Sequence, residues 1–216
     1  MLHVVLTTKN KSVYVKTLHT LLGIESICTQ VGLPIEITFV NEDTHNKIEI
    51  LKKVSKTSDR IVWFDYGISI DRGSIPEIVR KFEGIDCLIF PCVREGIDWG
   101  MFTDKCKQGS SEPTNQMALS FDVDVSNRVL NKESEFYEVT KAHKPACWCM
   151  DSKRVLKKLK DKKKEFTFPK DIQTFFDKCV SGKIVVAAAA KSKTFNHFTH
   201  ECVGNIMNMS GLKVTK

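Results

Sequence analysis

Short apolar runs alternate with amphipathic segments along the first part of the chain. Residues 2–7 and 61–64 are mainly apolar runs of the kind that form buried strands, and residues 35–40 predict a further strand between them. The segments between them, 13–31 and 44–55, carry apolar side chains at helical spacing. An order of strand, helix, strand, helix, strand predicts right-handed crossovers and an α/β fold with a largely parallel sheet.

The alternation continues for one more helix and strand and then breaks down. We predict a helix from about Gly73 to Phe82 and a strand at 86–91. From Arg94 to Lys144, Gly, Ser, Pro and Asn interrupt short strand-like pieces, most clearly at 117–125, which indicates an antiparallel insertion. Regular order returns in four further segments: a strand at 146–150, a lysine-rich helix at 153–164, a helix from Asp171 to about Val180 and a strand at 182–187.

Length and composition set the class of protein. The chain has 216 residues, of which 42% are hydrophobic and 27% charged, as expected for a globular protein with its own core. No apolar run approaches the roughly 20 residues that span a bilayer, and Met1 to Thr8 lacks the features of a secretory signal. We therefore expect a cytoplasmic chain, or a piece cut from something larger.

Eight cysteines lie mostly among apolar neighbours, without the dense pattern of a small secreted fold. We interpret them as reduced core thiols. Period-2 spacing puts Cys147 and Cys149 on one face of a strand, so a zinc site that adds His197, His200 and Cys202 remains an alternative.

The net charge of +7 suggests an anionic partner. Many of the lysines fall in 153–164, where Val155, Leu156 and Leu159 recur at helical spacing. The simplest interpretation is a solvated helix face, with a nucleic-acid or membrane-surface role as the alternative.

Polar side chains follow each of the first three predicted strands. Because the carboxyl ends of parallel strands meet at one edge of a sheet, these side chains are expected to converge on a ligand site. They are Thr8, Lys9, Glu42, Asp43 and Asp65. The alternatives are that Asp65 merely begins a turn, and that Glu42 and Asp43 cap the next helix, which Thr44 could also do.

Three segments, in this order along the chain, carry a pattern known from one group of enzymes. Ile61-Val-Trp-Phe-Asp-Tyr-Gly67 is an apolar strand that ends on a carboxylate. Cys147-Trp-Cys-Met-Asp-Ser-Lys-Arg-Val-Leu156 and Lys170-Asp171, followed by a helix, Gly182 and a strand, form the second segment. The third is Phe195-Asn-His-Phe-Thr-His200. Together they resemble nucleotide-sugar glycosyltransferases of the GT-A fold, in the broad inverting group.

The resemblance implies a Rossmann-like GT-A domain with a nucleotide-sugar-binding half at 1–93 and an acceptor-side half at 94–216. It implies Asp171 as the catalytic base and a divalent cation, Mn²⁺ or Mg²⁺, that neutralises the leaving diphosphate. The implied metal ligands are Asp65 and His197, with His200 as a substitute. The implied nucleotide-sugar-binding residues are Thr7, Thr8, Lys9, Glu42, Asp43, Arg60, Asp65, Tyr66 and Gly67. Tyr66, Trp99 and Trp148 could stack on a sugar, although Trp148 also fits a core position.

Two positions depart from the family pattern. Gly67 stands where the second carboxylate of the Asp-x-Asp motif is usual, which puts the metal in doubt. Lys170 replaces the first member of an acidic pair, so that Asp171 alone is left to act as the base.

Within that family the chain looks most like the amino-terminal glycosyltransferase domains of capsid-glycosylating enzymes of chloroviruses, which are large DNA viruses. This narrower likeness implies a UDP-linked hexose or deoxyhexose donor, a capsid glycan or glycoprotein as acceptor, work in the host cytoplasm, and further domains beyond Lys216.

Two other functions remain open. The net charge and the literal Asp122-Val-Asp124 would suit a nucleic-acid-binding or nucleotidyl-transfer protein, since period-2 spacing puts both carboxylates on one strand face. We interpret that pair instead as the solvent face of an edge strand. The missing carboxylate at Gly67 would suit an inactive sugar-nucleotide binder.

Overall fold

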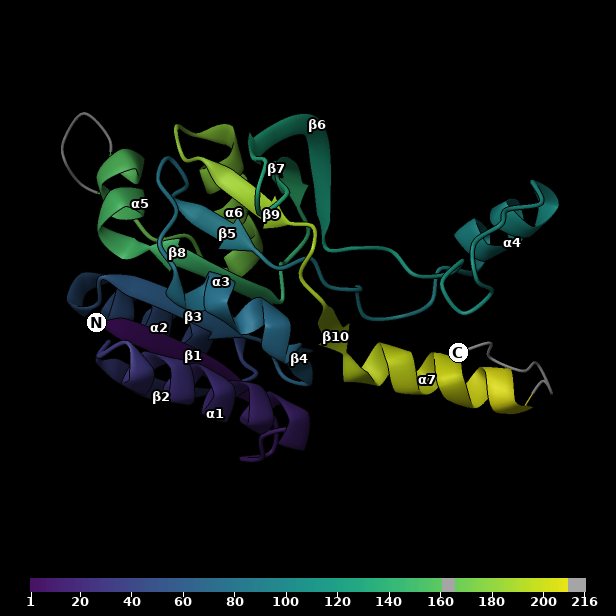
Figure 1. Cartoon of the computed structure of the whole chain (residues 1–216), viewed down its shortest axis with the longest axis horizontal. Coiled ribbons are helices and arrows are strands. Elements are labelled where there is room, and N and C mark those ends of the chain that lie inside the picture. The colour runs from purple at the N-terminus through teal and green to yellow at the C-terminus, as the bar shows by residue number, and fades with distance from the viewer. Residues whose placement is uncertain (161–165, 210–216) are drawn as a thin grey trace.

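The computed structural model describes residues 1–160 and 166–209, and its centre is a mixed sheet of eight strands (Figure 1). The strand order across the sheet is β2-β1-β3-β8-β5-β9-β7-β6. The strands are β1 (Leu2–Thr8), β2 (Ile35–Asn41), β3 (Arg60–Phe64), β5 (Cys87–Ile89), β6 (Val123–Asn131), β7 (Phe136–Ala142), β8 (Cys147–Asp151) and β9 (Val186–Ala189).

Most strands of this sheet run in one direction. β1 pairs in parallel with both β2 and β3, and β5 pairs in parallel with β9. β8 is antiparallel to both of its neighbours, β3 and β5, and β7 is antiparallel to β9 and β6. The predicted α/β fold with a mixed, mainly parallel sheet is therefore confirmed.

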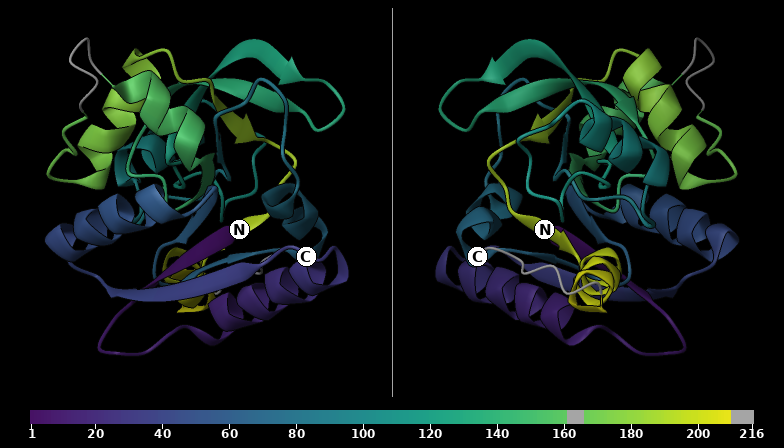
Figure 2. Two further views of the ribbon diagram at one scale, coloured as in Figure 1. Left: turned by 90° about the vertical axis from the view of Figure 1, so that its left-hand side faces the viewer. Right: turned by 90° about the vertical axis from the view of Figure 1, so that its right-hand side faces the viewer.

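Helices cover both faces of the sheet (Figure 2). On one face lie α1 (Val15–Gln30) and α3 (Ile75–Val79), which begins after the 3₁₀ turn η1 (Arg72–Ser74). On the other lie α2 (Thr44–Thr57), α5 (Ser152–Leu159) and α6 (Ile172–Ser181). Strands buried on both faces need continuous apolar runs, which explains why β1 and β3 show no polar alternation.

Alternate residues of the central strands enter opposite cores. Trp63 of β3 and Trp148 of β8 face the α2 and α6 side, where their rings stack with centroids 5.5 Å apart. Cys147 and Cys149 face the opposite core and are fully buried. The zinc alternative is therefore wrong for these two thiols. All eight cysteines are free, and six of them are buried, as predicted.

The second half of the chain departs most from the sequence-based predictions. A helix that we did not predict, α4 (Trp99–Lys107), lies within the insertion. The strand predicted at 117–125 is wrong up to Asp122, because β6 begins at Val123 and pairs with β7 as a hairpin at the end of the sheet. A second sheet joins β4 (Ile68–Ile70) to β10 (Thr194–Asn196), and α7 (His197–Met209) follows. Helices α4 and α7 both project from the same side of the molecule (Figure 1).

Several predicted boundaries also shift. The helix after Gly73 ends at Val79 rather than near Phe82, and the late strand begins at Val186 rather than Gly182. The lysine-rich helix ends at Leu159, and residues 161–164 of its predicted span lie outside the described part of the chain. Across the described residues, none of the helices combines the length and apolar character needed to cross a membrane.

The burial of Trp148 in the stacked pair predicts that its substitution destabilises the protein far more than substitution of Trp99. Trp148 is fully buried and also meets Phe176 edge-on at 5.3 Å, whereas Trp99 on α4 is 55% exposed. We expect Trp148→Ala to lower the free energy of unfolding by about 3–5 kcal/mol through the cavity it leaves, and Trp99→Ala by less than about 0.5 kcal/mol. Urea denaturation of both variants measures this, and equal losses would contradict the described core.

Candidate functional site

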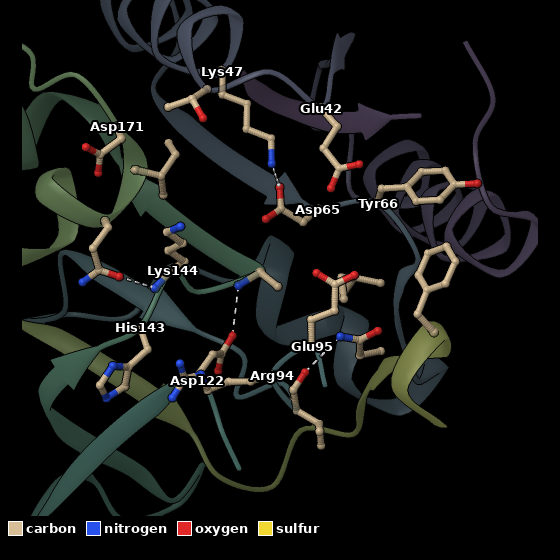
Figure 3. Close-up of a pocket in the computed structure, with 18 of the residues that line it drawn as sticks. Glu42, Lys47, Asp65, Tyr66, Arg94, Glu95, Asp122, His143, Lys144 and Asp171 are labelled. Carbon is tan, nitrogen blue, oxygen red and sulfur yellow. Dashed lines mark hydrogen bonds and ion pairs between the residues drawn. The ribbon is translucent and has the colours of Figure 1, made fainter. Parts of the chain in front are cut away.

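A cavity of about 800 Å³ opens at the carboxyl ends of β1, β2 and β3 (Figure 3). Lys9, Glu42 and Asp65, from the loops after these three strands, line its first wall together with Tyr66. The predicted convergence of the polar strand ends is therefore present in the structure. The opposite wall comes from the loop between β7 and β8 and the start of α6, and the floor from the loop after β5: His143, Lys144, Asp171, Gln173, Val93, Arg94 and Glu95.

Asp65 stands at the centre of the first wall. Its backbone N–H donates to the Ala146 carbonyl at 2.8 Å, which continues the pairing of β3 with β8 by one residue. Its side-chain Oδ1 accepts three hydrogen bonds: from Thr7 Oγ1 at 3.0 Å, Lys47 Nζ at 2.7 Å and Trp63 Nε1 at 3.1 Å. Within residues 1–160 and 166–209, Oδ2 accepts no side-chain or backbone hydrogen bond, and the side chain is 30% exposed. One oxygen is thus fixed by the protein and the other remains available to a ligand.

Lys47 is a functional candidate that the sequence analysis missed. It lies in the first turn of α2 and lines the cavity, and its side chain is 15% exposed. A cation at a helix N-terminus is electrostatically unfavourable, so the ion pair with Asp65 offsets a cost. Helical spacing offered a signal, because Lys47 is four residues before the buried Leu51 and therefore lies near the face of α2 that packs on the sheet.

The cap of α2 and the ends of β1 hold the rest of the first wall. Asp43, not Thr44, is the N-cap, and its Oδ1 accepts from the Asn46 N–H at 2.8 Å. Thr8 Oγ1 donates to the Val40 carbonyl at 3.1 Å. Lys9 Nζ lies 3.9 Å from Glu42 Oε2, where both side chains are about half exposed. Thr7, Thr8 and Asp43 thus support the wall, while Lys9 and Glu42 face the cavity.

Gly67 is required by the turn that follows Asp65. The Ile68 N–H donates to the Asp65 carbonyl at 3.3 Å, and Gly67 has φ +75°, a conformation that favours glycine. A Cβ at this position would lie 2.8 Å from Cδ2 of Phe198, the second residue of α7. The Phe198 ring thus occupies the space that a second carboxylate of an Asp-x-Asp motif would need.

His197 and His200 lie outside the cavity lining. Nε2 of His197 is 2.7 Å from Ser69 Oγ on β4, and its ring stacks on Tyr14 with centroids 4.8 Å apart. Burial lowers the pKa of His197, and Lys16 adds to this effect. Nδ1 of His200 is 2.6 Å from the Asn196 carbonyl. Both rings serve the attachment of α7, so the structure does not bring the predicted metal ligands together.

The side chains present do not fit a divalent cation. Across residues 1–160 and 166–209, no group of three or more His, Cys, Asp or Glu side chains is placed to hold a metal ion. A cation at this wall would therefore depend on Asp65, with water and the diphosphate as its other ligands. At Asp65 the ammonium of Lys47 already lies against Oδ1. The implied cation is therefore without a ligand set in the described part of the chain.

Arg60 was predicted to add positive charge to the site, and this prediction is wrong because the residue lies away from the cavity. It begins β3, whereas the cavity lies where β3 ends. Its guanidinium donates to the carbonyl of Val79 at 3.0 Å and to that of Arg80, so it satisfies the C-terminal end of α3. The side chain acts in the core of the fold, away from the cavity.

Asp171 faces the cavity from the opposite wall, as the N-cap of α6. Its Oδ1 accepts from the Thr174 N–H at 2.8 Å and its Oδ2 from Thr174 Oγ1 at 3.0 Å. The residue is half-buried, so a ligand hydroxyl can still reach it. Tyr66 lines the cavity beside Phe198, with ring centroids 5.5 Å apart, whereas neither Trp99 nor Trp148 contributes to the lining.

Asp122 lies at the floor of the cavity and is buried, which corrects the prediction of a solvent-facing pair. Its Oδ1 accepts from the Cys92 N–H and its Oδ2 from the Ala146 N–H, both at 2.9 Å. Burial raises the pKa of this carboxyl to about 7, although the backbone hydrogen bonds oppose the rise. Asp124 is exposed and lies 3.1 Å from Nε2 of His143. The two carboxylates do not share a site, because β6 begins only at Val123.

Comparisons with known proteins give structural overlaps of low similarity. No protein-family model matches the chain, and no curated protein matches its sequence. The catalytic domain of Drosophila beta1,4galactosyltransferase 7 in complex with xylobiose overlaps 88% of this chain and 65% of its own, at a TM-score of 0.45 and 7% identity. GalNAc-T7 with UDP, GalNAc and Mn²⁺ overlaps 90% of this chain and 42% of its own, at a TM-score of 0.45 and 10% sequence identity.

A third solved structure, the inositol-1-phosphate CTP transferase from T. maritima, overlaps 95% of this chain and 77% of its own, at a TM-score of 0.41 and 10% identity. The chain spans less than two thirds of the length of the first two proteins. Overlaps at this level do not identify an activity for the chain.

The turn at Gly67 predicts a specific loss of stability. We expect Gly67→Ala to lower the free energy of unfolding by about 1–3 kcal/mol, because a Cβ is strained at φ +75° and meets the Phe198 ring. The double variant Gly67→Ala/Phe198→Ala should lose less than the sum of the two single variants, since the collision is removed. Thermal unfolding of the three variants measures this, and strict additivity would contradict the contact.

The buried carboxyl of Asp122 predicts a pH dependence of stability. Its pKa is about 7 in the folded state against 3.8 as the ordinary value, so folding favours the protonated form. This contribution is complete below about pH 4 and is lost as the pH rises to about 7. Between pH 5 and pH 8 the wild type should lose roughly 2–3 kcal/mol relative to Asp122→Asn. Urea denaturation across this range is the measurement, with Asp104→Asn, at an exposed position of α4, as the control that should keep the wild-type slope.

Proposed function

We propose that the cavity binds a nucleotide-sugar donor and that the chain transfers the sugar to a hydroxyl group of a glycan or glycoprotein acceptor with inversion. The observation that carries the proposal is one cavity with a polar wall at the carboxyl ends of three parallel strands and a carboxylate, Asp171, on the facing wall. Ligands of α/β sheets bind at such strand ends, and about 800 Å³ is an ordinary volume for a small-molecule site.

The first wall would hold the nucleotide. The free Oδ2 of Asp65 can accept a hydrogen bond from a ribose or sugar hydroxyl, and Glu42 offers a second acceptor. Lys9 and Lys47 bring two ammonium groups to the same wall, where a diphosphate needs positive charge. The rings of Tyr66 and Phe198 add an apolar surface against which a base or sugar can lie.

The facing wall would hold the acceptor. Asp171 is the proposed general base, which takes the proton of the acceptor hydroxyl while the bond between the sugar and the diphosphate breaks. A base on the side opposite the leaving group directs the acceptor oxygen to the opposite face of the anomeric carbon. Displacement from that face inverts the configuration of this carbon. Lys144 lines the same wall and can bind a neighbouring hydroxyl of the acceptor. The amide of Gln173 makes hydrogen bonds to Lys144, Ala142 and Asp177 and holds this wall in place.

A nucleic-acid or nucleotidyl-transfer function was the alternative, and of its two supports the net charge of +7 is unchanged while the Asp122/Asp124 pair is divided. That alternative used Asp122 and Asp124 as a joint cation site, and the first is buried against backbone N–H groups while the second is exposed. The finer assignments, a UDP-linked hexose or deoxyhexose and an acceptor on a viral capsid glycan, rest on the sequence resemblance alone.

The role of Asp171 can be separated from its role as a helix cap. Asparagine caps helices about as well as aspartate but cannot take a proton, so Asp171→Asn should keep the fold and donor binding while lowering turnover by about 10²- to 10⁴-fold. The assay is release of the nucleoside diphosphate from UDP-, GDP- and dTDP-sugars, with and without a sugar acceptor. Asp98→Asn, which changes the N-cap of α4 outside the cavity lining, is the matched control and should keep wild-type turnover.

Three results would count against parts of this proposal. If no donor binds to the wild type, a nucleotide-sugar site is excluded. If donors bind but neither free sugar nor transferred sugar forms with any acceptor, the chain is an inactive binder. If the anomeric configuration of the product, measured by NMR, is retained, direct displacement is wrong.

A further inference from the structure

The ammonium of Lys47 holds a place in the cavity that is unusual for a lysine. It is 2.7 Å from Asp65 Oδ1, and only 15% of the side chain is exposed. An ammonium has three N–H groups, and the hydrogen bond to Asp65 uses one of them. In the part of the chain that the structure describes, Nζ makes no second hydrogen bond. Two donors of a partly desolvated cation are therefore free to bind a ligand.

The carboxylate that a divalent cation would use is engaged by this lysine. Oδ1 of Asp65 also accepts from Thr7 and Trp63, so its capacity as an acceptor is already taken by three donors. Gly67 supplies no second carboxylate, because Phe198 fills that space. A dication bound at Oδ2 would lie next to the ammonium and be repelled by it. The local charge therefore favours a single cation beside Asp65, and the ammonium of Lys47 is that cation.

We propose that Lys47, positioned by Asp65, takes the place of the divalent cation, so that the chain binds the diphosphate of its donor without a metal. This inference rests on the proposed function. The ammonium donates two hydrogen bonds to diphosphate oxygens, and Lys9 at the rim of the cavity adds a second positive charge. Asp65 then acts as a positioning residue rather than as a metal ligand.

The transfer step balances with these groups alone. The acceptor oxygen forms a bond to the anomeric carbon as the bond from that carbon to the diphosphate oxygen breaks. The electron pair of the broken bond stays on the diphosphate, where the positive charge of Lys47 stabilises it. The proton of the acceptor hydroxyl passes to the carboxylate of Asp171. No oxidant, reductant or further reactant is needed.

Binding of nucleoside diphosphates tests the inference. The dissociation constants of UDP, GDP and dTDP are measured by calorimetry for the wild type in EDTA, in Mg²⁺ and in Mn²⁺. We expect the best of the three to bind with equal affinity, within about twofold, in all three buffers. In EDTA, Lys47→Met should weaken this binding by about 10- to 100-fold, because it keeps the length of the side chain and removes the charge-assisted hydrogen bonds.

Lys52→Met is the matched control, since Lys52 is on the same helix and outside the cavity lining. Its side chain is 45% exposed, and its Nζ lies 3.6 Å from Glu49 Oε1. This variant should bind as the wild type does. Thermal unfolding of both variants checks that they fold, and the comparison of buffers uses the wild type alone, so it does not depend on any variant.

The outcomes separate the two proposals. Binding that needs Mg²⁺ or Mn²⁺ and is lost in EDTA overturns the role of Lys47 and leaves the nucleotide-sugar site intact. Wild-type affinity of Lys47→Met in EDTA overturns the role of Lys47 as well. If none of the three diphosphates binds to the wild type in any buffer, the proposed function itself is overturned.

Discussion

The hydrogen bonds to Oδ1 of Asp65 join three elements that are distant in the sequence. Thr7 lies near the end of β1, Lys47 lies in the first turn of α2 and Trp63 lies within β3, and all three donate to this one oxygen. Left without an acceptor, each buried or half-buried donor would carry a desolvation cost. The carboxylate therefore fixes the start of α2 against the ends of two strands, and the shape of the donor-side wall depends on it. The same contacts leave Oδ2 free, so that support and ligand recognition use different oxygens of one side chain.

The strand ends could be predicted from the sequence because they depend on local pattern and simple topology. Apolar runs indicated β1 and β3, residues 35–40 indicated β2, and parallel pairing then placed the polar residues that follow them, such as Thr8 and Asp65, at one edge. Lys47 could not be assigned in this way. Its contact with Asp65 depends on how α2 packs on the sheet, and the sequence between the two residues gives the helix but not its rotation about its axis.

The remaining parts of the site depend on contacts between distant segments, which cannot be predicted from the sequence of either short segment. Ser69, the partner of His197, is on a strand of three residues, which is too short to show a periodicity. The alternation expected at Asp122 and Asp124 fails because β6 starts between them, and the pairing of β6 with β7 shifts its register immediately afterwards. Asp122 instead links the loops at Cys92 and Ala146, and long-range contacts of this kind follow from the complete fold.

The close approach of Phe198 to Gly67 also limits which residues this fold accepts at position 67. A substitution that introduced a carboxylate at Gly67 would meet the aromatic ring of Phe198 and a backbone conformation that favours glycine. A substitution that removed the ring would first take away part of the contact between α7 and the Tyr66 side of the cavity. Each single step is unfavourable without the other, so a metal-binding motif and the present position of α7 exclude one another. The position of α7 thus makes an Asp-x-Asp motif at this turn a change of two residues, since Gly67 and Phe198 would have to change together.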